Sequence, residues 1–351
     1  MKIEVYSPTI RRKEMDAVLT AMVEEKIGPG ERSKLLIQTA KEYTGFDYAL
    51  ALRSPAVALR LALKALNVKD GQTVIISALS PCYYLQVIEE SRLTPLLCDV
   101  TFDFPCMNRD IIENAIEKNG GHSAIGAIVL SHTLGFTPDA RSIAELGIPV
   151  IEDISQSYGN WIKTDEDPKE ADIHGVFCIL GLEERDMLTS GGGALLFAMS
   201  KKDSAALRNF QDIADEYCLP DINAAMAVVQ FKEMSRNIKK RNEIAGIYAR
   251  ASMSLAARTA HKRFICLSED DKNYFSFSLV LESGLKDVLA YAKKKDIILE
   301  NAFEKTIAGA NVRANCPVSN SLALRTVLFP MYPRLRSHDV ERISRLIMTL
   351  P

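Results

Sequence analysis

The sequence lacks the features that would connect it to nucleic acids or membranes. It has 43 Lys and Arg against 45 Asp and Glu, a formal net charge of −2, so no basic excess is available to neutralise phosphates and no nucleic-acid partner is expected. No apolar run approaches the roughly 20 residues that cross a bilayer. Residues 1–15 become charged before an apolar stretch typical of secretory signals can form, which favours a cytoplasmic location.

Cysteine and histidine are present, but they are not spaced as a disulfide framework or a metal site. The seven cysteines include no CxxC pair, and the five histidines stand apart from one another and from the cysteines. This usage is typical of reduced thiols in a cytoplasmic protein. Neither disulfides nor a bound metal is expected.

Apolar patterning predicts an α/β fold with a mostly parallel sheet. Short runs that are almost entirely apolar alternate with stretches of helical spacing, as expected when helices cover both faces of the sheet. Strands are predicted at 48–52, 73–77, 95–99, 124–130 and 149–152, with helices at 56–66, 83–90, 109–117 and 140–145.

The two ends of the chain differ from this alternating middle. A Gly-Pro-Gly break at 28–30 separates two predicted helices, and a long helix is predicted from 221 past 248. Beyond it the predicted elements are strands at 274–281 and about 326–328, and helices at 285–295 and 338–348. We therefore expect a large domain over residues 1–250 and a smaller α+β domain over 251–351.

Five phrases, in the correct order, resemble the sugar aminotransferases of the DegT/StrS type. They are GPGERSKLLIQTAKEYTGFDYALAL, VALRLALKALNVKDGQTVII, IPVIEDISQSYGN, LPDINAAMAVVQFKEMSRNIKKRNEIAGIYA and CPVSNSLALRTVLFPMYPRLRSHDVERI. The resemblance implies the fold-type-I architecture of pyridoxal-phosphate transferases, with pyridoxal or pyridoxamine phosphate as cofactor. It also implies a nucleotide-linked sugar as ligand, in polysaccharide biosynthesis, and a homodimer or a heteromer with an intact paralogue.

Two residues retain the cofactor contacts of this family. Asp153 directly follows the predicted strand 149–152, at the edge where open α/β sheets bind ligands. The resemblance implies that Asp153 faces the pyridine nitrogen and that Gln156 lies near the ring's hydroxyl. The alternative is that Asp153 only caps the turn that follows the strand.

The family's phosphate loop is altered. Its usual phrase S-G-T-A-A-L is replaced by SPAVAL at 54–59. Pro55 has no N–H to donate, and Ala56 has no hydroxyl, although proline is well tolerated at the first position of a helix. Cys178 replaces a serine that the family places near the phosphate. The resemblance therefore predicts lost phosphate contacts at Pro55, Ala56 and Cys178.

Other positions of the cofactor pocket also depart from the family. Pro81 occupies the place of the aromatic that stacks on the pyridine ring, where Tyr83 or Tyr84 could substitute; core packing of these tyrosines is the alternative. The phrase DEYCL at 215–219 replaces the family's Asn-x-Arg, so the arginine that reaches a partner's cofactor is absent, and Leu219 ends this phrase.

The catalytic lysine has no counterpart. The family pattern F-S-F-x-x-x-K-x-L-T-T-G-E-G-G is replaced by FCILGLEERDMLTSGGG, two residues longer, and no lysine occurs between Lys169 and Lys201. Counting forward places Glu183 in the lysine position, and counting back places Arg185 there. Arginine stays protonated and delocalised, and glutamate cannot form an imine, so neither replaces the lysine.

Three functions follow from these residues. The first is a degenerate family member, a pseudoenzyme unable to form the Schiff base. The second is an active enzyme on nucleotide sugars that binds pyridoxal or pyridoxamine phosphate noncovalently, with Glu183 or Glu184 as base. The third is a cofactor-free module that binds a sugar nucleotide, or a regulatory, non-catalytic subunit.

Overall fold

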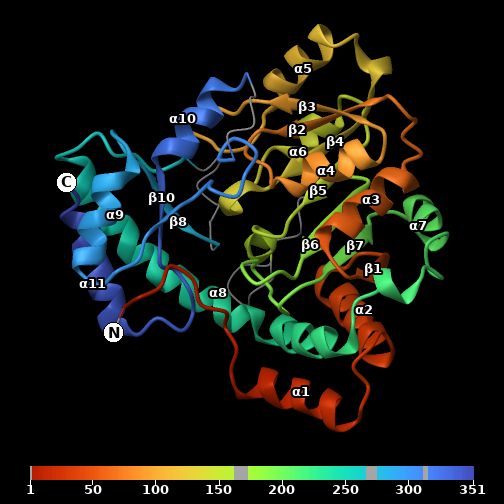
Figure 1. Cartoon of the computed structure of the whole chain (residues 1–351), viewed down its shortest axis with the longest axis horizontal. Helices are drawn as coiled ribbons and strands as arrows, with labels where there is room; N and C mark the ends of the chain where they lie inside the picture. Colours follow the sequence, from red (N-terminus) through yellow and green to blue (C-terminus); the bar gives the residue numbers. More distant parts are fainter. Residues whose placement is uncertain (1, 162–172, 266–274, 311–314) are drawn as a thin grey trace.

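The centre of the molecule is a seven-stranded sheet. The computed structural model describes residues 2–161, 173–265, 275–310 and 315–351. The strand order is β1-β7-β6-β5-β4-β2-β3 (Figure 1). The strands are β1 Tyr48–Leu52, β2 Thr73–Ser77, β3 Thr94–Cys98, β4 Ile125–Ser131, β5 Val150–Asp153, β6 Phe177–Gly181 and β7 Ala194–Ala198. Only β7 runs against its neighbours, so the predicted mostly parallel α/β sheet is confirmed.

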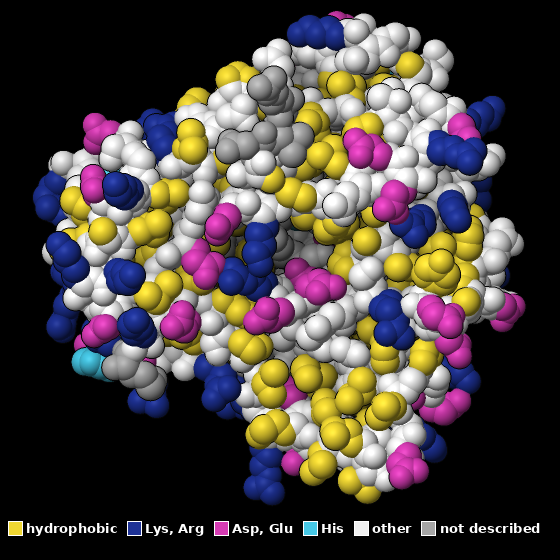
Figure 2. All heavy atoms as spheres, viewed as in Figure 1, with side chains coloured by type: hydrophobic (Ala, Val, Ile, Leu, Met, Phe, Trp, Pro, Cys, Tyr) yellow, Lys and Arg dark blue, Asp and Glu magenta, His cyan; other side chains and the backbone are white. Residues whose placement is uncertain are grey.

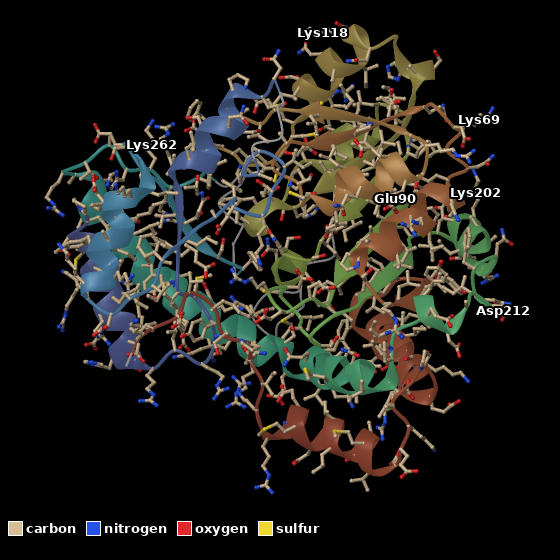
Figure 3. All side chains as sticks on the ribbon, viewed as in Figure 1. Lys69, Glu90, Lys118, Lys202, Asp212 and Lys262 are labelled. Carbon is tan, nitrogen blue, oxygen red and sulfur yellow. The ribbon has the colours of Figure 1, made fainter. Side chains whose placement is uncertain are left out.

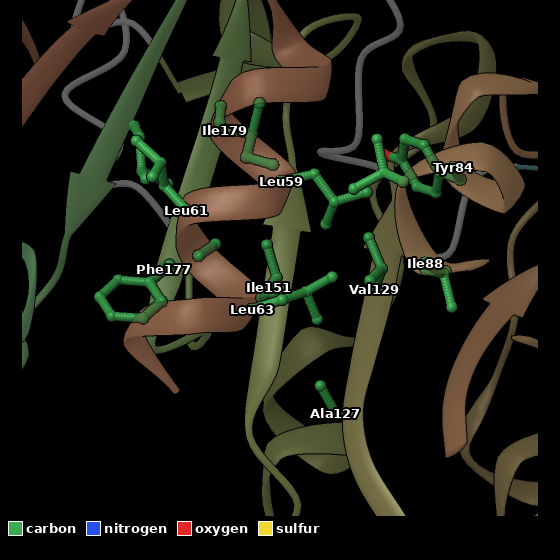
Figure 4. Close-up of a cluster of buried hydrophobic side chains, with 14 of the residues drawn as sticks. Leu59, Leu61, Leu63, Tyr84, Ile88, Ala127, Val129, Ile151, Phe177 and Ile179 are labelled. Carbon is green, nitrogen blue, oxygen red and sulfur yellow. The ribbon is translucent and has the colours of Figure 1, made fainter. Parts of the chain in front are cut away.

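Helices cover both faces of this sheet. They are α2 Glu31–Thr44, α3 Pro55–Ala65, α4 Tyr83–Glu90, α5 Arg109–Lys118, α6 Ala140–Ala144 and α7 Lys201–Arg208, while α1 Arg12–Val23 lies at the edge of the molecule (Figure 1). Alternate residues of β6 point to opposite faces: Phe177 and Ile179 pack with α3 and α4, and Leu180 packs with α2. Figure 4 shows the first of these clusters, in which Leu59 and Tyr84 lie against Val129 and Ile151.

A single long helix joins this sheet to a second, smaller sheet. Helix α8, Asp221–Ala256, packs beside α1 and α2 at one end and against α11, Ser337–Met348, at the other (Figure 1). The smaller sheet has the order β8-β10-β9, antiparallel throughout. The strands of this sheet are β8 Phe277–Val280, β9 Glu300–Asn301 and β10 Thr326–Phe329. The C-terminal part of the chain also contains the helices α9 Leu285–Lys294 and α10 Pro317–Arg325.

The smaller sheet has its own hydrophobic core. Ile244 and Tyr248 of α8 contribute to it, and so does Ile3 from the other end of the chain. The Tyr248 hydroxyl donates to the Pro330 carbonyl at 2.9 Å. Because α8 runs without interruption through position 250, the division of the chain into residues 1–250 and 251–351 stays a prediction.

Other expectations from the sequence can be compared with the described part of the chain. None of its helices is long and apolar enough to cross a bilayer. The six cysteines that it includes are free thiols, whereas Cys266 lies outside the described residues. No cluster of three or more potential metal-ligating side chains occurs among the described residues.

Candidate ligand-binding site

A cavity of about 660 Å³ opens where the large sheet meets the C-terminal unit. One wall consists of residues at the carboxyl ends of β4 and β5 and at the start of α3 and α4. The segment 183–186, which follows β6, forms the rim, and residues 300–306 close the cavity from the C-terminal unit. Figure 2 shows a hollow at the middle of the molecule with Lys or Arg and Asp or Glu side chains around it.

Asp153 lies at the floor of this cavity with both carboxylate oxygens occupied. It ends β5, beside Ser131 of β4. Its Oδ2 accepts a hydrogen bond from the Tyr84 hydroxyl at 2.5 Å. Its Oδ1 accepts from the backbone N–H of Ser155 at 3.0 Å and from the Ser155 hydroxyl at 2.5 Å. The structure therefore places Asp153 where the sequence predicts, but its carboxylate is bound by neighbouring side chains.

The two tyrosines at the start of α4 occupy different environments. Tyr84 is fully buried in the core, whereas Tyr83 lines the cavity. Their rings are 4.9 Å apart at 70°. Burial, and then the charge of Asp153, raises the pKa of both hydroxyls. Pro81 also lines the cavity and pairs with Thr306 of the C-terminal unit, so it contributes to the contact between the two units.

The segment expected to carry a lysine forms a tight turn at the rim. The Asp186 N–H donates to the Glu183 carbonyl at 3.1 Å. Glu183 and Arg185, the two candidates for the lysine position, both line the cavity. The Arg185 guanidinium donates to Glu300 of β9 at 2.5 and 3.3 Å and lies over the Tyr6 ring at 5.8 Å. Arg185 thus links the rim to the C-terminal unit.

Asp186 is a carboxyl group of this site that sequence reasoning missed. It accepts a hydrogen bond from the Glu183 N–H at 2.9 Å. Its carboxylate and the Ser155 hydroxyl approach Gly181 so closely that a Cβ there would lie 2.2 Å from the former and 2.8 Å from the latter. Burial, and then the charge of Asp153, raises the pKa of Asp186 to about 8. At neutral pH this side chain therefore mostly keeps its proton.

Residues 54–59, which the sequence predicts to be an altered phosphate loop, form the start of α3. Pro55 occupies the first helical turn and lines the cavity, and the Ser54 hydroxyl accepts from the Val57 N–H at 3.3 Å. Ala56 instead packs partly buried against the core of the sheet. Cys178 is fully buried on the opposite face of the sheet, together with Leu180. The structure does not bring Ala56 and Cys178 to the cavity, because α3 and β6 turn those side chains elsewhere.

Gln156 lines the cavity and also stabilises a loop. Its Oε1 accepts a hydrogen bond from the Leu134 N–H at 2.7 Å. Leu134 has a φ of 55°, a left-handed conformation that is uncommon for a side chain of this kind. The neighbouring His132, a second lining residue that the sequence did not single out, contacts Glu152 at 3.0 Å and the Ser157 hydroxyl at 2.8 Å.

The charges around the cavity are unbalanced. Six acidic side chains line it, those of Asp153, Glu183, Glu184, Asp186, Glu300 and Glu304, and of these Asp186 mostly keeps its proton. The lining cations are Arg185, which is bound to Glu300, and Lys305. Lys305 is the only lysine among the described lining residues. The lysines labelled in Figure 3, among them Lys69, Lys118 and Lys202, point outward from the molecule, and Lys169 lies outside the described residues.

Comparisons of the sequence with known proteins agree with this architecture. The sequence model of the DegT/DnrJ/EryC1/StrS aminotransferase family matches residues 8–166 and 164–348. The dTDP-4-dehydro-2,3,6-trideoxy-D-glucose 4-aminotransferase of Saccharopolyspora spinosa is 22% identical over 383 residues, covering 97% of this chain and 95% of that protein. EpsN of Bacillus subtilis strain 168, assigned as a pyridoxal phosphate-dependent aminotransferase, is 24% identical over 269 residues, covering 71% of this chain and 68% of EpsN.

Solved structures share the fold. An aminotransferase from Psychrobacter cryohalolentis superimposes with a TM-score of 0.84 at 16% identity, covering 97% of this chain and 96% of the other. A protein of Streptococcus pneumoniae assigned as a sugar aminotransferase, solved in its PLP form, gives a TM-score of 0.83 at 17% identity, covering 99% and 98%. The fold-type-I architecture predicted from the sequence is confirmed by these similarities.

Proposed function

The chain belongs to the DegT/DnrJ/EryC1/StrS aminotransferase family, and from this premise we propose that it keeps the family's binding cavity but does not transaminate. The observation that carries the proposal is the rim segment 183–186. It lies at the cavity and reads Glu-Glu-Arg-Asp where the resemblance expects a lysine. An amine that can lose its proton is required to form an imine with an aldehyde, and none of these four side chains supplies one.

The residues of the cavity do not fit pyridoxal phosphate well. The carboxylate that would face the pyridine nitrogen is engaged by Tyr84 and Ser155. The helix start that would face the phosphate begins with Pro55, which has no N–H, and the Ser54 hydroxyl already accepts from Val57. A helix start binds phosphate through free backbone N–H groups. The phosphate end of the cofactor therefore lacks a donor at Pro55, and at the other end the cofactor would share the Asp153 carboxylate with Tyr84 and Ser155.

The charge of the cavity also disfavours a phosphate inside it. Five carboxylates and the mostly protonated Asp186 surround the space, and the Arg185 guanidinium is bound to Glu300. Like charges in a partly buried site repel strongly because the local dielectric constant is low. Carboxylates and the Gln156 amide are instead good hydrogen-bond acceptors and donors for sugar hydroxyls. We propose that a nucleotide-linked sugar binds with its sugar in the cavity and its phosphates toward solvent.

A second candidate function is an enzyme with noncovalent cofactor. It is favoured by one observation, that Asp153 and Gln156 both line the cavity. In that case added pyridoxal phosphate would bind reversibly and Asp153→Asn would abolish binding. If a dTDP-linked sugar binds while pyridoxal phosphate does not, the cofactor-free function is supported instead. Calorimetric titration of the wild type and Asp153→Asn with both ligands separates these two cases.

The experiment that tests the main proposal is reductive trapping. The protein is incubated with equimolar pyridoxal phosphate, treated with borohydride and weighed by intact mass spectrometry. We expect no stoichiometric mass increase. Lys305→Arg is the matched control, because Lys305 is the lysine that lines the cavity among the described residues. A stoichiometric adduct that this substitution removes would show that Lys305 forms the imine, and the proposal would be wrong.

A further inference from the structure

The Asp186 carboxyl group offers an unused oxygen to the cavity. Its Oδ2 accepts one hydrogen bond, from the Glu183 N–H at 2.9 Å. Its Oδ1 accepts no hydrogen bond within the described part of the chain, and it is not one of the polar atoms enclosed in the interior. The adjacent Arg185 guanidinium is bound to Glu300 instead. Because Asp186 lines the cavity, its Oδ1 is available to a ligand.

The hydrogen bonds around the two aspartates of the cavity decide which of them keeps a proton. Asp153 accepts three, from the Tyr84 hydroxyl and from the N–H and the hydroxyl of Ser155. The Ser155 hydroxyl in turn accepts from the Gly181 N–H at 2.7 Å, so it has no second proton to give to Asp186. Donated hydrogen bonds stabilise a carboxylate, and a nearby negative charge favours the protonated acid. Asp153 is therefore the ionised partner, and Asp186 carries the proton.

Asp186 changes charge just above neutral pH. Burial, and then the charge of Asp153, raises its pKa to about 8, while the Glu183 N–H opposes this rise and the Glu183 carboxylate adds to it. Two tyrosines lie within the range of its charge. Burial raises the pKa of Tyr6 to about 12 and that of Tyr83 well above its ordinary value. Both tyrosines therefore stay protonated when Asp186 loses its proton.

We propose that Asp186 selects the ligand by donating a hydrogen bond, through its carboxyl proton, to an uncharged oxygen of the bound sugar. This role rests on the proposed function, in which a nucleotide-linked sugar places its sugar in the cavity. A protonated carboxyl group is a donor, whereas the ionised side chains of Asp153, Glu183 and Glu304 only accept hydrogen bonds. Among the acidic residues of the cavity, a sugar oxygen that needs a donor is thus matched by Asp186.

The chemical class of the ligand follows from this role. A neutral sugar leaves the proton on Asp186, because its oxygen accepts a hydrogen bond and carries no charge. A sugar with an ammonium group at that place would instead favour the Asp186 carboxylate, because opposite charges attract. Above the pKa of Asp186, binding of a neutral sugar therefore takes up a proton. Binding of an amino sugar at this position would release one.

Proton uptake on binding tests this role directly. The full-length protein is titrated calorimetrically with dTDP-glucose at pH 7 and pH 9, in two buffers with different heats of ionisation. For the wild type we expect uptake of about one proton at pH 9, and a dissociation constant about tenfold higher than at pH 7, because only the protonated acid binds. Asp186→Asn keeps a donor and an acceptor for the Glu183 N–H, but it has no proton to exchange. It should bind equally at both pH values and take up no proton.

Two further variants separate this role from a structural one. Asp186→Leu lacks the donor, so it should bind dTDP-glucose about tenfold more weakly than the wild type at pH 7, with an unchanged circular dichroism spectrum. Asp47→Asn removes an exposed carboxyl group just before β1, away from the cavity lining, and it should follow the wild type. A contribution from the Cys82 thiol, which lines the cavity, or from the nucleobase would persist in Asp186→Asn.

The proposed function and the role of Asp186 fail in different ways. Failure of dTDP-glucose to bind at pH 7 would overturn the proposed function, and the role of Asp186 with it. Binding without proton uptake at pH 9, uptake that persists in Asp186→Asn, or release of a proton would each overturn the role of Asp186 alone.

Discussion

At the scale of single residues, the carboxyl group of Asp186 makes the site respond to pH. Asp153 accepts hydrogen bonds from Tyr84 and Ser155, and its charge contributes to the raised pKa of Asp186. One of two neighbouring carboxyl groups in a poorly solvated place keeps its proton. The site therefore contains a carboxylate and a mostly neutral acid side by side, in the region where the family's lysine is expected.

Asp186→Asn should change the pH dependence of stability. In the folded protein the pKa of Asp186 is about 8, against an ordinary value of 3.8. Between these values the folded state holds an extra proton, so the free energy of unfolding falls as the pH rises. The variant has no carboxyl group at this position, so its free energy of unfolding does not fall with pH for this reason. In urea titrations we expect the free energy of unfolding of the variant to be higher than that of the wild type by at least about 1 kcal/mol at pH 8, and by progressively less toward pH 4. A difference that does not vary with pH would contradict this.

Tyr84→Phe should destabilise the protein through Asp153. The substitution removes a hydroxyl that donates to Asp153 and accepts from Ser131. A buried charged acceptor that loses its donor costs about 1–3 kcal/mol. The matched control is Tyr83→Phe, at the adjacent cavity-lining tyrosine, for which we expect less than about 1 kcal/mol. Urea unfolding of both variants measures the difference, and equal losses would show that the bond to Asp153 is unimportant.

Sequence reasoning located some site residues and missed others for identifiable reasons. Asp153 could be placed because it directly follows a predicted strand, and a strand end fixes the position of the next residue. Asp186 could not be placed from the sequence, because its burial depends on its approach to Gly181 and Ser155, which belong to separate segments. Lys305 reaches the cavity from the C-terminal unit, and no local pattern in the sequence encodes that approach.

At the scale of secondary-structure elements, the start of α3 shows how the chain completes a helix start with its own residues. Pro55 suits the first helical position because its φ is preset and its missing N–H would be unpaired there. The Ser54 hydroxyl caps the helix from within the chain. The helix start is therefore completed by its own residues rather than by a bound phosphate.

Ser54→Ala tests this account of α3. Loss of the cap should lower the free energy of unfolding by about 1 kcal/mol. The matched control is Ser200→Ala, which removes the equivalent cap of α7 and should cost a similar amount. Millimolar inorganic phosphate should leave the melting temperature of the wild type and of both variants unchanged. A phosphate-dependent rise that is specific to an intact α3 start would show that this helix still binds phosphate.

Most elements of the fold could be predicted from apolar patterning. Strands β1 and β2 and helix α4 match their predicted bounds, and the other predicted elements begin within a few residues of the observed ones. Strands β6, β7 and β9 and helices α7 and α10 have no counterpart among the predicted elements. The segment PVSNSLALR has little amphipathic spacing, and β9 is only two residues long. Tertiary contacts rather than local sequence determine these two elements.

At the scale of the whole molecule, the two units meet around the cavity through a few specific contacts. Arg185 of the rim bonds to Glu300 of β9, and Pro81 pairs with Thr306. The segment 300–306 contributes Glu300, Glu304 and Lys305 to the lining of the cavity. The large sheet and the smaller unit both contribute residues to the lining of the cavity.

The central claim is that this family member does not transaminate, and one measurement tests it without knowledge of the sugar. A mixture of L-amino acids is incubated in D₂O with the protein and pyridoxal phosphate, and the α-proton signals are followed by NMR. Transamination begins with removal of this proton from the amino donor. We predict exchange no faster than with pyridoxal phosphate alone. Exchange of the α-proton of one amino acid, well above that background and dependent on the protein, would contradict the account.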